Sequence, residues 1–225
     1  MTTGKPLFPA WTNRLGPLVG VLVLGGPVYA VLLLYYGGSP RTTDVGYAPV
    51  QPLPFSHEVH AGQMGLDCRY CHTTVETAAF AAVPPTSVCL NCHRNIGPEV
   101  EELAPIRQSD QSGKSVPWVR VHDLPDYVYF DHSAHVCRGV SCVSCHGRID
   151  RMERVYQAET LSMGWCLDCH RDPAPHLRPQ QYVTQLGWNL AEDPTIQEKD
   201  ARSLGERLLH QHRIAPSTDC STCHR

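Results

Sequence analysis

Ten of the eleven cysteines stand in five C-x-x-C pairs, and a histidine follows each pair directly. The pairs are Cys68/Cys71, Cys89/Cys92, Cys142/Cys145, Cys166/Cys169 and Cys220/Cys223, and the histidines are His72, His93, His146, His170 and His224. A C-x-x-C-H run is typical of c-type haem attachment, in which two thiols bond the porphyrin and the histidine ligates the iron. Zinc ribbons, redox pairs and disulfides also use C-x-x-C, but zinc coordination does not demand histidine at the next position. The sequence therefore predicts five covalently bound haem c groups.

An F-x-H-x-x-H motif occurs twice, at residues 55–60 and 130–135, each time shortly before an attachment pair. A second attachment pair follows in each case, and these second pairs read alike, C-L-N-C-H-R and C-L-D-C-H-R. A third, shorter copy begins near His210 and holds the last pair. The repeat predicts that residues 55–225 form one pentahaem cytochrome c domain with units 55–115, 116–200 and 201–225.

Histidines outside the attachment motifs outnumber the iron positions that they would fill. There are eight of them, against five irons and four methionines, which favours bis-histidine, low-spin ligation at every site. An H-x-x-H pair must serve two irons, because one porphyrin with its attachment histidine leaves one axial position open. The sequence predicts as distal ligands His57, His60, His132 and His135, with His122, His210 and His212 competing for the fifth iron.

Residues 15–36 contain no charged side chain over 22 positions. As a helix this segment is about 33 Å long, enough to cross a hydrocarbon layer of about 30 Å. A cleaved signal peptide is the competing interpretation, but its apolar stretch is usually about 7–15 residues long. Lys5 and Arg14 flank the N-terminal side. The positive-inside rule therefore predicts a cytoplasmic tail at 1–14, a transmembrane anchor at 15–36, a linker at 37–54 and a haem domain in the bacterial periplasm.

The rest of the composition predicts a domain with little regular structure. Nineteen prolines disfavour long elements, and the apolar side chains outside 15–36 are few for a core of this size. We therefore expect a mostly irregular, haem-packed domain with short helices. A net charge of −3 argues against nucleic-acid binding. Locally we expect a hairpin within 116–130, an amphipathic helix over 198–211 and burial of the unpaired Cys137 as a small apolar residue.

These motifs together resemble the membrane-anchored pentahaem cytochrome c subunit of alternative complex III, a quinol:electron-acceptor oxidoreductase, and also the small class III (c7-type) multihaem cytochromes. The matching stretches are 55–72, 84–86, 117–126, 130–147 and 163–166. The resemblance implies menaquinol oxidation in neighbouring integral membrane subunits. Electrons would pass through an iron–sulfur subunit and this chain to a monohaem cytochrome c subunit, and then to a soluble cytochrome c or copper protein. The resemblance also favours His122 over His210 as the fifth distal ligand.

Two other functions fit part of the pattern. A multihaem reductase, such as a nitrite- or hydroxylamine-converting enzyme, needs an iron with an open position, which the surplus of histidines disfavours. A small membrane-anchored quinol dehydrogenase shares the topology but usually holds its first haem near the membrane, whereas 31 residues separate Tyr36 from Cys68 here. We expect an electron-transfer subunit that has no catalytic residue of its own.

Overall fold

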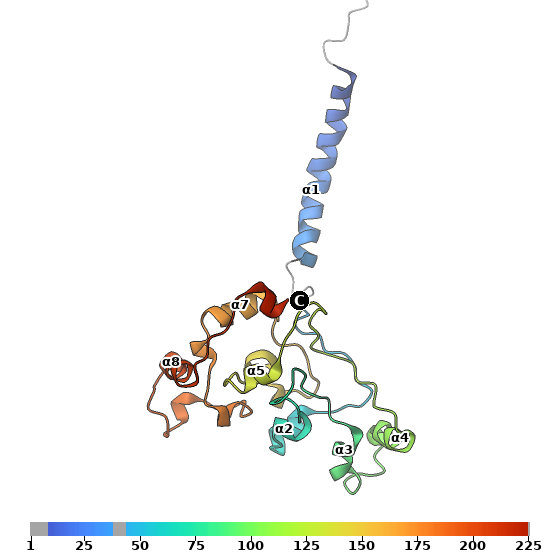
Figure 1. Ribbon diagram of the computed structural model, residues 1–225. Coiled ribbons are helices and arrows are strands. Elements are labelled where there is room, and N and C mark those ends of the chain that lie inside the picture. The colour runs from blue at the N-terminus through green and yellow to red at the C-terminus, as the bar shows by residue number, and fades with distance from the viewer. Residues whose placement is uncertain (1–8, 38–43, 225) are drawn as a thin grey trace, which may run out of the picture. The chain divides into compact units, whose positions relative to one another are not determined.

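The computed structural model describes residues 9–37 and 44–224 (Figure 1). Expectations for the tail at 1–8, including Lys5, for linker positions 38–43 and for residue 225 lie outside the described residues. The chain divides into two compact units between Asp44 and Val45. Each unit is described by itself below.

Among the described residues of the first unit, one long helix is the main element. A 3-10 turn, η1 (Ala10–Arg14), leads into α1 (Leu15–Gly37), which has 23 residues and contains Pro27. Within Trp11–Gly37 an 18-residue window has a mean hydropathy of 2.2, so this helix is long and apolar enough to cross a membrane. The helix predicted at 15–36 is therefore present. A helix of this length and composition near the N-terminus serves as a membrane anchor or as a signal sequence.

The second unit contains short helices joined by irregular segments, as the composition predicted (Figure 1). The part of it that the structure describes has no strand and two isolated bridges, Val128 with His224 and Val140 with Leu177. Its α-helices are α2 (Cys68–Cys71), α3 (Thr86–His93), α4 (Ala104–Ser112), α5 (His132–Val136), α6 (Val143–His146), α7 (Met163–Arg171), α8 (Ala201–His212) and α9 (Cys220–Cys223). The remaining turns are η2 (Glu58–Gln63), which is π-helical, and the 3-10 turns η3 (Glu101–Leu103), η4 (Ile149–Arg151), η5 (Ala174–His176), η6 (Gln180–Tyr182) and η7 (Leu190–Glu192).

The predicted hairpin within 116–130 is wrong. Both main-chain groups of Val119 hydrogen-bond to the side-chain amide of Gln51. The Val119 N–H donates to Oε1 at 2.9 Å, and the Val119 carbonyl accepts from Nε2 at 2.9 Å. At the other end of the segment, Val128 pairs with His224. Because these backbone groups are used by residues distant in sequence, they cannot form the ladder of a local hairpin.

The apolar core is small. One cluster joins Leu204 and Leu208 of α8 to Leu177 and Ile196, and a second contains Val75, Val136 and Val183. The helix predicted at 198–211 is confirmed as α8. It begins at Ala201 because the Asp200 side chain accepts a hydrogen bond from the Ser203 amide at 2.9 Å.

Candidate functional site

Each C-x-x-C-H motif forms one helical turn. In three motifs the backbone N–H of the histidine donates a hydrogen bond to the carbonyl of the first cysteine, at 2.8 Å in α2, 2.9 Å in α6 and 2.8 Å in α9. The other two motifs lie inside the longer helices α3 and α7. Residues three apart share one face of a helix, so both thiols of a motif lie on the same side. Asp67 and Ser162 cap α2 and α7 by accepting from the amides of Arg69 and Trp165. Local sequence alone therefore presents two thiols and an imidazole together.

Four of the five attachment histidines have the same kind of partner at Nδ1. In each of these, Nδ1 lies within hydrogen-bond distance of a main-chain carbonyl: His72 with Ala82 at 2.8 Å, His93 with Ile96 at 3.1 Å, His170 with Ser217 at 2.7 Å and His224 with Tyr127 at 3.3 Å. A carbonyl can only accept, so the ring proton must reside on Nδ1. Nε2 then keeps a free lone pair, which is the arrangement that metal-ligating histidines use.

The two F-x-H-x-x-H motifs repeat this arrangement. His60 and His135 each donate from Nδ1 to the carbonyl four residues earlier, Ser56 at 2.8 Å and Asp131 at 2.7 Å, and His132 donates to Ala79 at 2.8 Å. The Nδ1 of His57 is buried and has no hydrogen-bond partner in the described part of the chain.

The phenylalanine of each motif orients both histidines that follow it. Phe55 stacks on His60 with ring centroids 4.4 Å apart and meets His57 edge-on at 4.9 Å. Phe130 does the same with His135 at 4.5 Å and His132 at 4.8 Å. The sequence motif alone did not reveal a role for these phenylalanines. Their recurrence at the same offset was the signal that could have revealed it.

Three distal candidates face three attachment histidines. Their ring centroids are 6.2 Å apart for His60 and His93, 6.4 Å for His132 and His146, and 6.0 Å for His135 and His170. Two imidazoles that bind one metal ion from opposite sides at about 2 Å each have ring centres about 6 Å apart. The spacing therefore fits an iron between each pair, and the thiols beside each attachment histidine fit covalent haem.

A cluster of imidazoles surrounds His146. The pKa of His146 is lowered to about 3, first by burial and then by the nearby His122, His132, His72 and His57. The pKa of His57 is lowered to about 4, first by burial and then by His72 and His60. These rings are therefore neutral at ordinary pH, which is the form that ligates metal. The cluster also brings the first and third attachment histidines close together.

The comparisons with known proteins give one informative relative. No protein-family model matches the chain. Over 141 residues it is 31% identical to the multihaem cytochrome c subunit of menaquinone reductase from Nitratidesulfovibrio vulgaris, a match that covers 53% of this chain and 67% of the relative. The chain belongs to the family of that multihaem cytochrome c subunit. Membership implies covalently bound haem c and a role in electron transfer.

The thiols of this multihaem cytochrome form a continuous series. Burial raises the pKa of Cys71, and the neighbouring Cys89 adds to the effect, so the first and second attachment pairs are adjacent. A hydrogen bond with Cys142 raises the pKa of Cys68 and links the first pair to the third. Burial raises the pKa of Cys145 to about 12, with a contribution from Cys169 of the fourth pair.

The series ends at the C-terminal motif. Burial raises the pKa of Cys166 in the fourth pair, and Cys223 of the fifth pair contributes next. The attachment pairs of the cytochrome therefore follow one another in space in the order second, first, third, fourth, fifth. Sequence order alone does not predict this arrangement, because the first pair lies between the second and the third.

Two of the predicted attachment thiols lie at the protein surface. Cys92 of the second pair and Cys220 of the fifth pair are exposed, whereas the other eight paired cysteines are half-buried. Cys92 and Cys220 belong to the second and fifth pairs, which are the two ends of the series.

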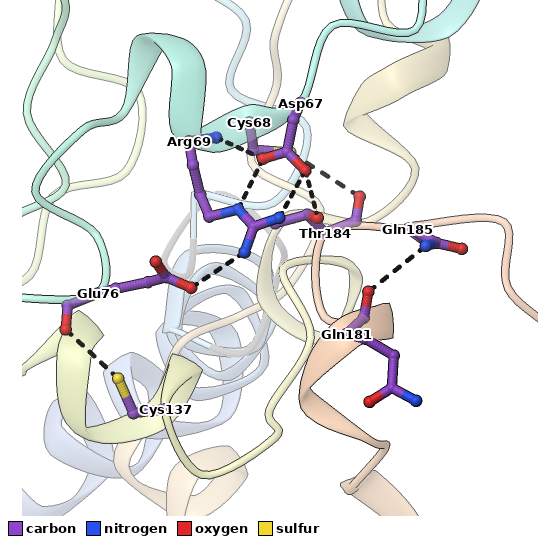
Figure 2. Close-up of polar contacts among 8 residues, drawn as sticks. All are labelled: Asp67, Cys68, Arg69, Glu76, Cys137, Gln181, Thr184 and Gln185. Carbon is purple, nitrogen blue, oxygen red and sulfur yellow. Dashed lines mark hydrogen bonds and ion pairs between the residues drawn. The ribbon is translucent and has the colours of Figure 1, made fainter.

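A polar network holds the first attachment turn in place (Figure 2). Arg69 forms ion pairs with Asp67 at 2.8 Å and Glu76 at 3.2 Å, and Asp67 accepts a hydrogen bond from Thr184 at 2.8 Å. The Cys137 thiol donates to the Glu76 carbonyl at 3.3 Å, and Cys137 is exposed. The expectation that Cys137 is buried is therefore wrong. Its thiol donates a hydrogen bond to the Glu76 carbonyl in the loop that follows α2, and it is not packed in the apolar core.

The candidates for the fifth iron lie apart from one another. His210 and His212 are exposed near the end of α8, and the His212 carbonyl accepts a hydrogen bond from Arg138 at 3.4 Å. The half-buried His122 lies against His146, with its Nε2 3.4 Å from the Nδ1 of His146. His224 contacts Tyr127, with ring centroids 5.9 Å apart.

Proposed function

We propose that this chain is a membrane-anchored pentahaem c-type cytochrome that relays electrons from quinol oxidation, received through an iron–sulfur subunit, to a downstream cytochrome c or cupredoxin. The three facing imidazole pairs, with ring centroids 6.0–6.4 Å apart, carry the proposal. Two imidazoles on one iron fill both axial positions and leave no place for a substrate. When bound, haem supplies reversible one-electron chemistry. The protein's own residues hold it, orient its ligands and keep those ligands neutral.

The proposed sites follow the sequence motifs. Haem is attached through the ten paired cysteines, and the histidine after each pair is the proximal ligand: His72, His93, His146, His170 and His224. The proposed distal ligands are His57, His60, His132 and His135, and for the fifth iron the sequence offers His122, His210 and His212. The adjacency of the thiols supports one line of carriers whose ends are the second and fifth attachment sites.

The proposed topology rests on α1. Residues 15–36 would anchor the chain, with 1–14 in the cytoplasm, the linker at 37–54 and the haem domain at 55–225 in the periplasm. Protease added to intact spheroplasts should remove the haem domain and leave a membrane-bound fragment. Full protection of the haem domain would contradict this orientation.

The ligation is tested on the intact, purified chain. Its mass should exceed that of the polypeptide by five haem groups, its resting EPR spectrum should be low-spin throughout, and carbon monoxide should leave the reduced spectrum unchanged. A high-spin, CO-binding fraction of one haem in five would favour the multihaem reductase interpretation and contradict the relay.

The relay is tested by its dependence on partners. The proposed partners are integral membrane quinol-oxidising subunits, the iron–sulfur subunit and a monohaem cytochrome c subunit. The isolated chain should be reduced by dithionite but not by a menaquinol analogue, and reduction should return when the partner subunits are added. Saturable reduction of the isolated chain by the analogue, blocked by quinone-site inhibitors, would identify a small quinol dehydrogenase instead.

The name of the relative favours a second direction of electron flow. That protein is a subunit of a menaquinone reductase, which reduces the quinone. If this chain serves the same direction, electrons would enter from a soluble donor and leave toward the membrane. Redox titration of the haems separates the two directions, because delivery to menaquinone requires potentials at or below that of the quinone, whereas menaquinol oxidation requires potentials at or above it.

A further inference from the structure

Arg178 carries a positive charge that is not paired with any carboxylate among the described residues. Its side chain is half-buried, and the ion pairs found within 9–37 and 44–224 do not include it. It lines a small cavity with Arg138, Gln180 and His212, and the described residues around that cavity include no aspartate or glutamate. A half-buried cation without a counter-ion acts strongly on neighbouring charges, because neither solvent nor a partner screens it fully.

The backbone of Arg178 is fixed against the loop that leads into the third attachment motif. Its N–H donates to the carbonyl of Gly139 at 3.0 Å, and the preceding Leu177 forms an antiparallel bridge with Val140. The two backbones are so close that a Cβ built on Gly139 would overlap the carbonyl oxygen of Arg178. Gly139 precedes Cys142 by three residues, so the fold sets the position of Arg178 beside this motif.

The segment that follows η6 holds both the guanidinium of Arg178 and the third attachment motif. The Gln185 carbonyl accepts from the guanidinium at 3.2 Å, and the Trp188 ring centroid lies 5.2 Å from the guanidinium carbon. In the same segment the Val183 carbonyl accepts from the N–H of Cys142 at 3.4 Å. Burial lowers the pKa of Arg178 and the nearby Cys142 opposes that change, so the two groups lie within Coulombic reach of each other. A thiol that is bonded to porphyrin carries no charge, so haem attachment leaves Arg178 without compensation from Cys142.

We propose that Arg178 is an electrostatic residue that raises the reduction potential of the haem attached at Cys142 and Cys145. Oxidised iron carries one more positive charge than reduced iron, so a fixed cation nearby favours the reduced form. The third pair is the middle of the spatial series of attachment pairs, so the charge acts on a carrier that electrons cross in either direction of flow. The inference rests on the proposed function, because it requires haem at the third attachment site.

The experiment is a redox titration of the full holo-chain in detergent, followed by visible and EPR spectra. Arg178→Gln removes the charge but keeps a polar side chain, whereas Arg178→Lys keeps the charge. In Arg178→Gln one midpoint potential should shift to a more negative value by more than the others, while every haem stays low-spin with unchanged EPR signals. In Arg178→Lys the potentials should stay close to those of the parent. Arg207→Gln is the matched control, because it removes the same charge from an exposed side chain that is paired with Glu198, and it should shift no potential.

Three results would overturn the proposal. If Arg178→Gln leaves every midpoint potential unchanged, the charge of Arg178 does not act on a haem. If Arg178→Lys shifts the potential as far as Arg178→Gln does, the cause is packing and not charge. If Arg207→Gln produces the same shift, the cause is the net charge of the chain. Mass spectrometry of the parent detects failure of the proposed function separately, as an absence of haem at Cys142 and Cys145.

Discussion

α8 lies so close to η5 that only glycine fits at one position of their contact. A Cβ built on Gly205 would overlap the carbonyl oxygen of Ala174, and it would lie 2.5 Å from the carbonyl carbon and 2.8 Å from the Cα. Because all three atoms belong to the backbone, no side-chain rotation relieves the overlap. Gly205→Ala must therefore push α8 away from η5.

The expected magnitude comes from two opposing effects. Alanine is the better helix former by about 1 kcal/mol. Against this, overpacking costs about 1–3 kcal/mol. Moving α8 also exposes part of Leu204 and Leu208, which are 1% and 5% exposed. About 50–80 Å² of newly exposed apolar surface costs roughly 1–2 kcal/mol more. We expect a net loss of about 2 kcal/mol, which lowers the Tm of a domain of this size by roughly 4–8 °C.

Thermal unfolding of the full holo-chain in detergent, followed by far-UV circular dichroism, measures this loss. The matched control is Glu206→Ala, because Glu206 is the next residue of α8 and is exposed. The control should change the Tm little, since surface substitutions usually stay within about 0.5 kcal/mol. If Gly205→Ala melts at or above the parent, helix propensity outweighs the contact and the packing argument is refuted.

Two further substitutions test polar contacts. Asp67→Asn should cost at most about 1 kcal/mol at pH 7, because the hydrogen bond from Arg69 lowers the pKa of Asp67 to about 2 but its side chain is 42% exposed. A carboxyl with a depressed pKa stabilises the fold above its unfolded pKa, so the difference should disappear in urea titrations as the pH falls from about 4 to 2. A difference that stays constant over that range would contradict this. Ser141→Ala removes a buried hydroxyl that donates to the Val183 carbonyl at 2.7 Å and should cost about 1 kcal/mol. An unchanged urea midpoint would show that this bond contributes nothing.

The sequence alone determined the features that depend on short stretches of chain. Haem attachment needs two thiols and an imidazole within five residues, so the five C-x-x-C-H motifs are readable without a fold. Family membership agrees with that interpretation. The long apolar helix was equally local, because its length and lack of charge are properties of consecutive residues. α8 followed from the spacing of Leu204, Leu208 and Leu209.

Only the tertiary structure decided which residues meet and which stay at the surface. The Nδ1 of His132 bonds the carbonyl of Ala79, and the Nδ1 of His170 bonds that of Ser217, across 53 and 47 residues of sequence. The expected hairpin is absent because the backbone N–H and C=O of Val119 hydrogen-bond to the side chain of Gln51, 68 residues away in sequence. The spacing of residues within a motif predicts what that segment can bind, but it does not predict how separate segments pack against one another. The spatial order of the attachment pairs, the exposure of Cys92 and the contact of His122 with His146 therefore emerged only once the chain was folded.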